Sequence, residues 1–271
     1  MIRVELVKML RRPRTWVTIT LLNLLPTLVA VLLAVTDVGP QPGQGPAFLS
    51  AVLTDGRLFP LAALAIVLPL LMPVAVAVVA GDAVAGEAQA GTLRYLLTRP
   101  VGRTRLLVAK LVSVLAFVLL SVVVVAAVGY VVGRLLLGGG DANTLVTGIS
   151  GAGLSSTQIV ERTLMSVVYV SLSMLGVAAL ALLLSTVTDS PLGAALGALA
   201  FLIASTLLLT LDAAAALQPF LPTRYWLSFV DLFRTPILWR DIVRGVALQG
   251  VYVLVFLGAA WANFTTKDIK S

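Results

Sequence analysis

The sequence predicts an all-α integral membrane protein that crosses the bilayer six times. Of its 271 residues, 59% are hydrophobic and only 11% are charged, whereas charged residues make up about 25% of a typical soluble domain. The mean hydropathy is +1.06, so lipid is expected to be the main solvent. At about 20 apolar residues per helical span, this length allows six spans with short connections in a single membrane domain, 1–271.

Six apolar stretches are each long enough to cross a membrane as a helix. The first follows basic residues, but its apolar run is too long for a signal sequence and no A-x-A cleavage site follows it. We therefore expect an uncleaved first span. The predicted spans are Trp16 to Val35, Leu58 to Ala80, Leu106 to Val132, Thr163 to Ser185, Leu192 to Leu211 and Val246 to Ala262.

The Lys and Arg residues predict the orientation of these spans. An even number of spans puts both termini on one side, and the loops richer in Lys and Arg face the cytoplasm. Twelve basic residues lie on the side of the termini and seven on the other, so both termini are expected in the cytoplasm. The twelve are Arg3, Lys8, Arg11, Arg12, Arg14, Arg94, Arg99, Arg103, Arg105, Lys110, Lys267 and Lys270. Because these charges mark span ends, the net charge of +7 does not indicate nucleic-acid binding.

The N-terminal stretch Met1 to Arg12 is predicted to be an amphipathic helix, interrupted by Pro13. Its apolar side consists of Ile2, Leu6, Met9 and Leu10, and its polar side of Glu5, Lys8 and Arg12. Such a helix lies flat on a membrane. Lys8, Arg11 and Arg12 are then expected near anionic headgroups, and we predict an elbow helix over 1–14.

Three further connections have distinct compositions. Asp37 to Gly56 and Gly138 to Ser156 are rich in Gly, Pro, Ser and Thr, which predicts exposed outer loops. Pro219 to Trp239 is aromatic and partly apolar but too short for a clean span. We interpret this segment, 219–239, as re-entrant or interfacial.

Residues 81–103, between the second and third spans, predict a compact cytoplasmic helix-turn-helix. Asp82 to Ala90 can form a short helix that ends at Gly91 in the left-handed conformation. Thr92 can cap a second helix, which Pro100 stops. Spacing alone favours a simpler interpretation, in which Gly86 and Gly91 are turn residues and Glu87 is a solvated charge on a helix face.

The order Gly86-Glu87, Gly91-Thr92-Leu93, Leu96-Leu97, Pro100 and Arg103 resembles the coupling segment of type-2 ABC exporter permeases. The tail Phe264-Thr265-Thr266-Lys267-Asp268-Ile269 is similar to the Phe-x-x-Lys-Asp-Ile ending of the bacitracin-efflux and sodium-efflux branches of that family. The basic N-terminal helix resembles its elbow helix. The resemblance covers essentially the whole chain.

This resemblance implies a permease of the bacterial plasma membrane that pairs with a second permease chain, as a homodimer or with a related chain. Each permease would dock one copy of a separate ABC ATPase, which holds ATP and Mg. The implied ATPase-coupling residues are Asp82, Glu87, Gly91, Thr92, Leu93, Arg94, Leu96 and Leu97. Glu87 and Arg94 are expected to be polar contacts and the leucines an apolar wedge.

The residue types present argue against the chain's own catalysis. The sequence contains no G-x-x-x-x-G-K-[ST] motif, so ATP is expected to bind a partner chain and no cofactor is expected here. Cysteine and histidine are both absent, which removes the commonest zinc ligands and the usual nucleophile and base. We therefore predict neither catalytic residues nor a metal site.

Two other functions stay open. An ion-coupled secondary transporter would be expected to hold charged residues inside its spans, and the middles of the six predicted spans lack them. A structural or force-transmitting membrane subunit without cargo is compatible with the same sequence. The mainly apolar spans favour an amphipathic or hydrophobic cargo such as an antibiotic, another drug or a lipid.

A substrate path is only weakly marked in the sequence. Polar residues within the spans are candidates for its lining, although packing hydrogen bonds between helices are the commoner use of such residues. The candidates are Asn23, Ser166, Tyr169, Thr206 and Thr210. Gly193 and Gly197 in the fifth span form a small-residue face that allows close helix approach, within one chain or between two.

Overall fold

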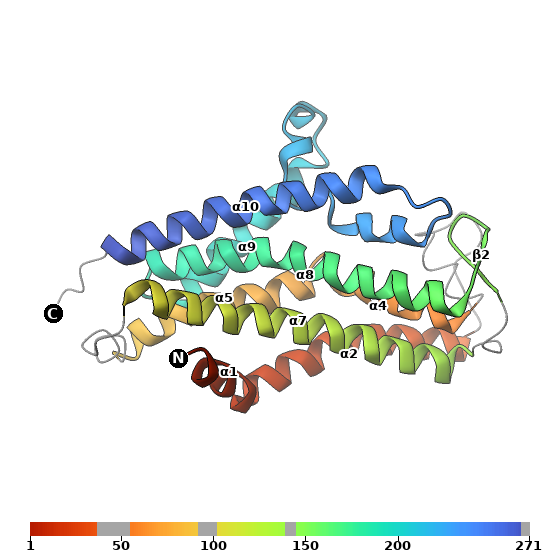
Figure 1. Cartoon of the computed structure of the whole chain (residues 1–271), viewed down its shortest axis with the longest axis horizontal. Helices are drawn as coiled ribbons and strands as arrows, with labels where there is room; N and C mark the ends of the chain where they lie inside the picture. Colours follow the sequence, from red (N-terminus) through yellow and green to blue (C-terminus); the bar gives the residue numbers. More distant parts are fainter. Residues whose placement is uncertain (37–54, 92–101, 139–144, 267–271) are drawn as a thin grey trace.

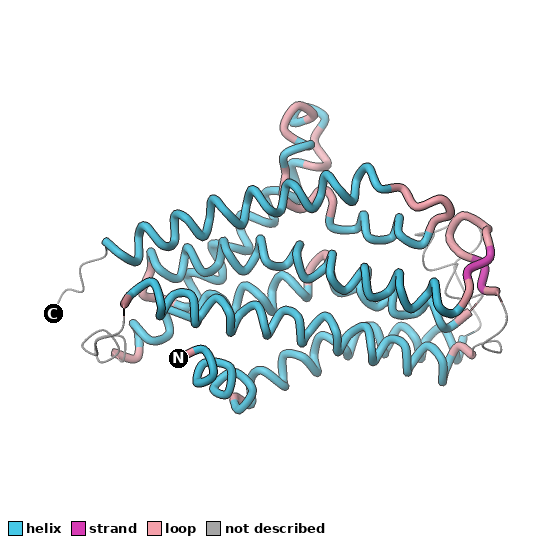
Figure 2. Tube along the Cα trace, viewed as in Figure 1, coloured by secondary structure: helices cyan, strands magenta, loops and turns pink. Residues whose placement is uncertain are grey.

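The computed structural model describes residues 1–36, 55–91, 102–138 and 145–266. Within these ranges, six helices are long and apolar enough to cross a membrane, which confirms the predicted number of spans. They are α2 (Pro13–Thr36), α5 (Leu71–Gln89), α7 (Arg103–Leu136), α8 (Ser156–Val187), α9 (Pro191–Leu208) and α10 (Trp239–Thr266). Figures 1 and 2 show a helical bundle in which α5, α7, α8, α9 and α10 follow the long axis.

Different segments of the chain lie at the two ends of the bundle. Figure 1 shows the start of α7 and the end of α10 at one end, and the hairpin of β1 (Val146–Thr147) and β2 (Gly153–Leu154) at the other. We call the first end the inner end and the hairpin end the outer end, following the orientation predicted from the basic residues. The helix α1 (Ile2–Arg11) is turned out of the long axis beside α2 and α7.

The centre of the bundle is α8, which contacts α5, α7, α9 and α10. Its buried residues include several small ones, among them Ala178, Ala179 and Ala181, which are fully buried. Small residues let helices in a membrane approach closely. The helix starts with a capping box, in which Ser155 Oγ accepts from the Gln158 amide and the Gln158 side chain accepts from the Ser155 amide.

The second predicted span, Leu58 to Ala80, is not one helix. It divides into α4 (Phe59–Val67), which follows the short turn η1 (Gly56–Leu58), and α5. The division falls at Pro69, whose ring would clash with the carbonyl of the residue four positions earlier in a continuous helix. Pro73 is tolerated because it lies in the first turn of α5, where amides have no helical partner. The helix α5 then continues to Gln89, so Asp82 to Ala90 extends a span and is not a separate helix.

Two glycines let α4 pack closely against α7. A methyl group on Gly129 would lie 3.0 Å from Ala63 Cβ, and one on Gly133 would clash with Phe59. The two glycines are four residues apart and therefore share one side of α7. At these two positions the backbone of α7 contacts residues of α4, and a larger residue at either position would prevent this contact.

Between α9 and α10 the chain forms three short 3-10 turns, η2 (Asp212–Ala214), η3 (Gln218–Phe220) and η4 (Trp226–Phe233). Trp226, Phe229, Leu232 and Phe233 of η4 are buried and the turn packs on α8 and α10. Within 219–239, which we interpreted as re-entrant or interfacial, the part formed by η4 is therefore folded onto the bundle, and the position of the segment relative to a membrane stays a prediction.

Candidate functional site

The corner between α1 and α2 is fixed by its own side chains. Arg12, which precedes Pro13, is extended and ends α1, as the residue before a proline usually is. Two carbonyls in the last turn of α1 accept side-chain hydrogen bonds, from Thr15 Oγ1 to Met9 O (2.8 Å) and from Trp16 Nε1 to Leu10 O (2.8 Å). These bonds satisfy helix-end carbonyls and set the angle at which α1 leaves α2.

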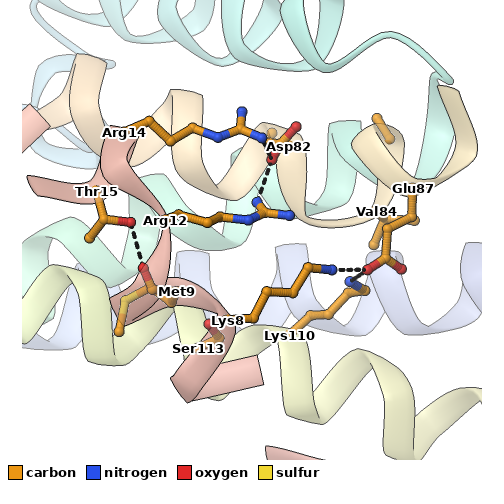
Figure 3. A network of polar contacts seen from close by, with 12 residues as sticks. Lys8, Met9, Arg12, Arg14, Thr15, Asp82, Val84, Glu87, Lys110 and Ser113 are labelled. Carbon is orange, nitrogen blue, oxygen red and sulfur yellow. Dashed lines mark hydrogen bonds and ion pairs between the residues drawn. The ribbon is translucent and has the colours of Figure 1, made fainter. Parts of the chain in front are cut away.

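The polar side of α1 faces the protein, and seven charged residues meet there at the inner end of the bundle. Figure 3 labels all of them except Glu5. We expected the apolar side of α1 to lie in the inner leaflet and its basic residues near headgroups, and the ion pairs show that Lys8 also contacts the protein. Met9 is buried, but Ile2 and Leu10 are 44% and 43% exposed. We call the seven residues the inner charge network; they are Glu5, Lys8, Arg12, Arg14, Asp82, Glu87 and Lys110.

Glu87 of α5 is the centre of this network. Its Oε1 atom lies 2.9 Å from Lys8 Nζ of α1 and 2.7 Å from Lys110 Nζ of α7. The side chains of Glu87 and Lys110 are 8% and 3% exposed. Charges removed from water in this way are stable only when they are paired. Glu87 therefore ties three helices together through one carboxylate.

A second carboxylate extends the network toward the surface. Asp82 Oδ2 lies 3.0 Å from Arg12 Nη1 and 3.3 Å from Arg14 Nη2. Both guanidinium groups are partly exposed, at 37% and 63%, so these pairs are weaker than the pair at Glu87. They nevertheless fix the α1–α2 corner to one side of α5.

A cavity of about 420 Å³ adjoins the network between α1, α2, α5 and α7. Its wall combines the charged residues with an apolar part made by Met9, Val78, Val79 and Val114. A cavity with one charged and one apolar wall matches a molecule that is itself amphipathic.

The inner end is further joined by hydrogen bonds between helices. Ser185 Oγ of α8 accepts from the amides of Val84 (3.1 Å) and Ala85 (2.8 Å) and donates to Gly81 O (2.6 Å). At the start of α7, Arg103 Nη1 donates to Thr265 O of α10 (2.9 Å). These bonds hold α5 to α8, and α7 to α10, on either side of residues 92–101.

Only some of the predicted ATPase-coupling residues fall in the described part of the chain. Gly91 has φ +68°, which confirms the predicted left-handed turn at the end of this helix. Asp82 and Glu87 are engaged within the chain, and the burial of Glu87 contradicts its interpretation as a solvated charge. Thr92, Leu93, Arg94, Leu96 and Leu97 lie outside the described residues, so their predicted roles stay predictions.

The predicted elbow residues differ in their surroundings. Lys8 and Arg12 pair with carboxylates of α5, and not only with lipid as we expected. Arg11 is exposed and available to headgroups.

The five candidates for a substrate path do not line the inner cavity. Asn23, Ser166, Thr206 and Thr210 each hydrogen-bond a carbonyl three or four residues earlier in the chain. Tyr169 donates to Tyr225 O (2.5 Å). A role in a pathway stays a prediction for all five.

Sequence reasoning missed Glu5, Lys110 and Ser185 as parts of this site. A signal was present for the two charged residues, because the inner ends of the predicted spans carried charges of both signs. Ser185 carried no specific signal, since the sequence alone does not indicate which of the many span serines bonds a neighbouring helix, or which helix it bonds.

These helices define a multi-pass membrane protein whose inner end is joined by a buried network of charges. The sequence matches the family described as "Protein of unknown function (DUF2705)" over residues 47–270. The match covers most of the chain, which therefore belongs to that family. No curated protein matches the sequence.

Proposed function

We propose that this chain is the membrane-spanning permease subunit of a type-2 ABC exporter. In this proposal a separate ABC ATPase docks on the segment between α5 and α7, binds ATP and Mg, and drives movement of the helices. The chain contributes the path for an amphipathic or hydrophobic substrate across the bacterial plasma membrane, with both termini in the cytoplasm.

The observation that carries the proposal is the position of the inner charge network. Residues 92–101, which hold most of the pattern resembling a coupling segment, connect α5 to α7, and Glu87 with Lys110 joins these two helices beside that connection. Lys8 adds α1 to the same carboxylate. A force applied to the connection would therefore act on three helices together, because buried ion pairs resist separation.

This geometry supports a changed role for Glu87. The sequence suggested that Glu87 contacts the ATPase directly. Its ion pairs with Lys8 and Lys110 instead favour a role in connecting helices within the chain. In the proposal, the leucines and Arg94 of residues 92–101 contact the ATPase, and Glu87 transmits their displacement to the elbow helix α1. The amphipathic cavity beside Glu87 is consistent with an amphipathic substrate.

The experiment is purification of the tagged chain from membranes of its native host, with identification of accompanying chains by mass spectrometry. The proposal expects an ATPase subunit with a Walker A motif. Replacing Leu93 and Leu97 by Asp should reduce recovery of that subunit about tenfold or more, because a charge in an apolar contact is costly to desolvate.

Leu145→Asp is the matched control, since Leu145 is 70% exposed at the outer end. This variant should retain the ATPase subunit fully. Absence of any ATP-binding chain from the purified material, with the helices intact, would contradict the proposal and favour a force-transmitting or structural subunit without cargo.

A further inference from the structure

The inner charge network carries one more positive than negative charge, and the excess lies on one side of it. Around Glu87, two ammonium groups face two carboxylates, those of Glu5 and Glu87, so this part is balanced. Arg12 and Arg14, by contrast, share the single carboxylate of Asp82 (Figure 3). Within the described residues, neither guanidinium group pairs with a second acid. One positive charge is therefore uncompensated at this side of the network.

The two guanidinium groups also keep hydrogen-bond donors for a ligand. Each group has five N–H donors, whereas Arg12 Nη1 donates to Asp82 Oδ2 (3.0 Å) and Arg14 Nη2 lies 3.3 Å from the same oxygen. The two side chains are 37% and 63% exposed, so their other donors are open to a ligand. The planar guanidinium group matches phosphate oxygens and binds them through two parallel hydrogen bonds. Arg14 also lies in the first turn of α2, where the helix dipole favours an anion.

The cavity beside these groups is polarised along the membrane normal. On three of the helices that line it, a charged residue is followed, one turn further from the inner end, by an uncharged one. The pairs are Asp82 with Val78 on α5, Lys110 with Val114 on α7, and Arg14 with Thr18 on α2. Each pair is four residues apart, which is about 6 Å along the helix axis. The charged wall thus lies toward the inner end and the apolar wall toward the middle of the membrane, as the headgroup and chains of an inner-leaflet lipid do.

Exposed leucines continue the apolar wall along α2. Leu21, Leu25 and Leu28 follow Arg14 and Thr18 at spacings that keep all five residues on one side of the helix. The three leucines are 58%, 39% and 62% exposed. From Arg14 to Leu28 the helix rises about 21 Å, which is more than half of the hydrocarbon thickness of about 30 Å. An acyl chain that starts in the cavity therefore finds apolar contacts through its whole leaflet.

A phospholipid fits this cavity better than a water-soluble anion does. A free phosphate ion would use only the charged wall and leave the apolar wall in contact with water, which is unfavourable. The cavity volume of about 420 Å³ is within the range of small-molecule sites, about 300–1,000 Å³. Anionic lipids are concentrated in the cytoplasmic leaflet, and basic pockets between helices on that side bind their headgroups.

We propose that this cavity binds one anionic phospholipid of the inner leaflet. Its phosphate oxygens accept hydrogen bonds from Arg12 and Arg14, and the first part of an acyl chain packs on Val78 and Val114. The bound lipid compensates the excess charge and connects the α1–α2 corner to α5 and α7. This inference goes beyond the proposed function, because a lipid bound here requires neither an ATPase nor transport.

The test is lipid binding by the full chain, purified in a non-ionic detergent and freed of lipid. Phosphatidylglycerol, which has one net negative charge, is titrated in, and native mass spectrometry counts the lipids on each chain. Phosphatidylcholine with the same acyl chains is the comparison, because it has no net charge. We expect a first phosphatidylglycerol to bind about tenfold or more tightly than phosphatidylcholine. Equal affinities for the two lipids would overturn the proposal.

Variants of the basic residues locate the bound lipid. Arg12→Gln and Arg14→Gln should each lower the affinity for phosphatidylglycerol about fivefold, and Arg14→Lys should lower it less, because the charge is kept. Arg11→Gln is the matched control, since Arg11 is exposed on the same helix as Lys8 and does not line the cavity. It should leave the affinity unchanged. An equal loss in Arg11→Gln and Arg14→Gln would indicate general attraction to a basic surface and would contradict a site in the cavity.

Soluble anions distinguish a lipid site from an anion site. Inorganic phosphate and glycerophosphoglycerol, the headgroup without acyl chains, are added to the chain at the concentration at which phosphatidylglycerol half-saturates it. We expect neither to displace the bound lipid, because neither contacts the apolar wall or the leucines of α2. Displacement by either compound at that concentration would show that the site takes a free anion, and the lipid proposal would fail.

Discussion

Removing the Lys110 ammonium group is the most direct perturbation of the inner charge network. Lys110 is 3% exposed and lies 2.7 Å from the carboxylate of Glu87, whose side chain is 8% exposed. Breaking a buried ion pair by removing one partner typically costs about 3–5 kcal/mol, because the remaining charge is left in a poor environment. Lys8 still pairs with Glu87 at 2.9 Å, so we expect Lys110→Met to lower the free energy of unfolding by about 3 kcal/mol, the lower end of that range.

The assay is unfolding in mixed micelles, followed by tryptophan fluorescence as the denaturing detergent increases. Arg14→Gln is the control, since Arg14 is 63% exposed and a surface pair contributes about 0.2–1 kcal/mol. The double variant Glu87→Gln, Lys110→Met should be less destabilised than the sum of the two single changes, by about 0.5–3 kcal/mol. Equal losses for Lys110→Met and Arg14→Gln, or strict additivity in the double variant, would refute the reasoning.

Three further predictions address the inner end and the orientation. Ser185→Ala should lower the free energy of unfolding in the same assay by about 1 kcal/mol, because it removes hydrogen bonds to α5. An unchanged midpoint of unfolding would contradict this prediction. An impermeant maleimide should label Leu145→Cys on whole cells and leave Gln89→Cys unlabelled until the membrane is opened, and the reverse pattern would invert the topology. Gly91→Val should lower the local stability of the end of α5 by about 1–2 kcal/mol, since a side chain is disfavoured in the left-handed conformation. The measurement is hydrogen exchange at the Ala90 amide, which should become faster, and Gly91→Asn is the milder control.

The spans could be predicted from sequence because the membrane imposes a simple length and composition requirement. The division of the second span at Pro69 was also readable in principle, since the proline ring excludes a continuous helix. We did not predict this division because the residues on both sides of Pro69 are apolar, and hydropathy alone does not distinguish one long helix from two shorter ones.

The site was predicted less well because its contacts join distant parts of the chain. Lys8 and Glu87 are 79 residues apart in sequence, and no local pattern indicates that they meet. The first helix has apolar residues on more than one side, including Val4 and Val7, which are 67% and 40% exposed. Amphipathic periodicity therefore could not decide which side faces the bundle. The left-handed Gly91, by contrast, was predictable because helix ends depend on local backbone geometry.

The central claim is that a separate ATPase drives this permease through residues 92–101. The direct measurement is ATP hydrolysis by the purified ATPase subunit in lipid vesicles, with and without this chain. The account predicts that the wild-type chain changes the hydrolysis rate several-fold, about a factor of five or more, and that the Leu93→Asp, Leu97→Asp chain does not. The same rate with the wild-type chain, the double variant and empty vesicles would contradict the account.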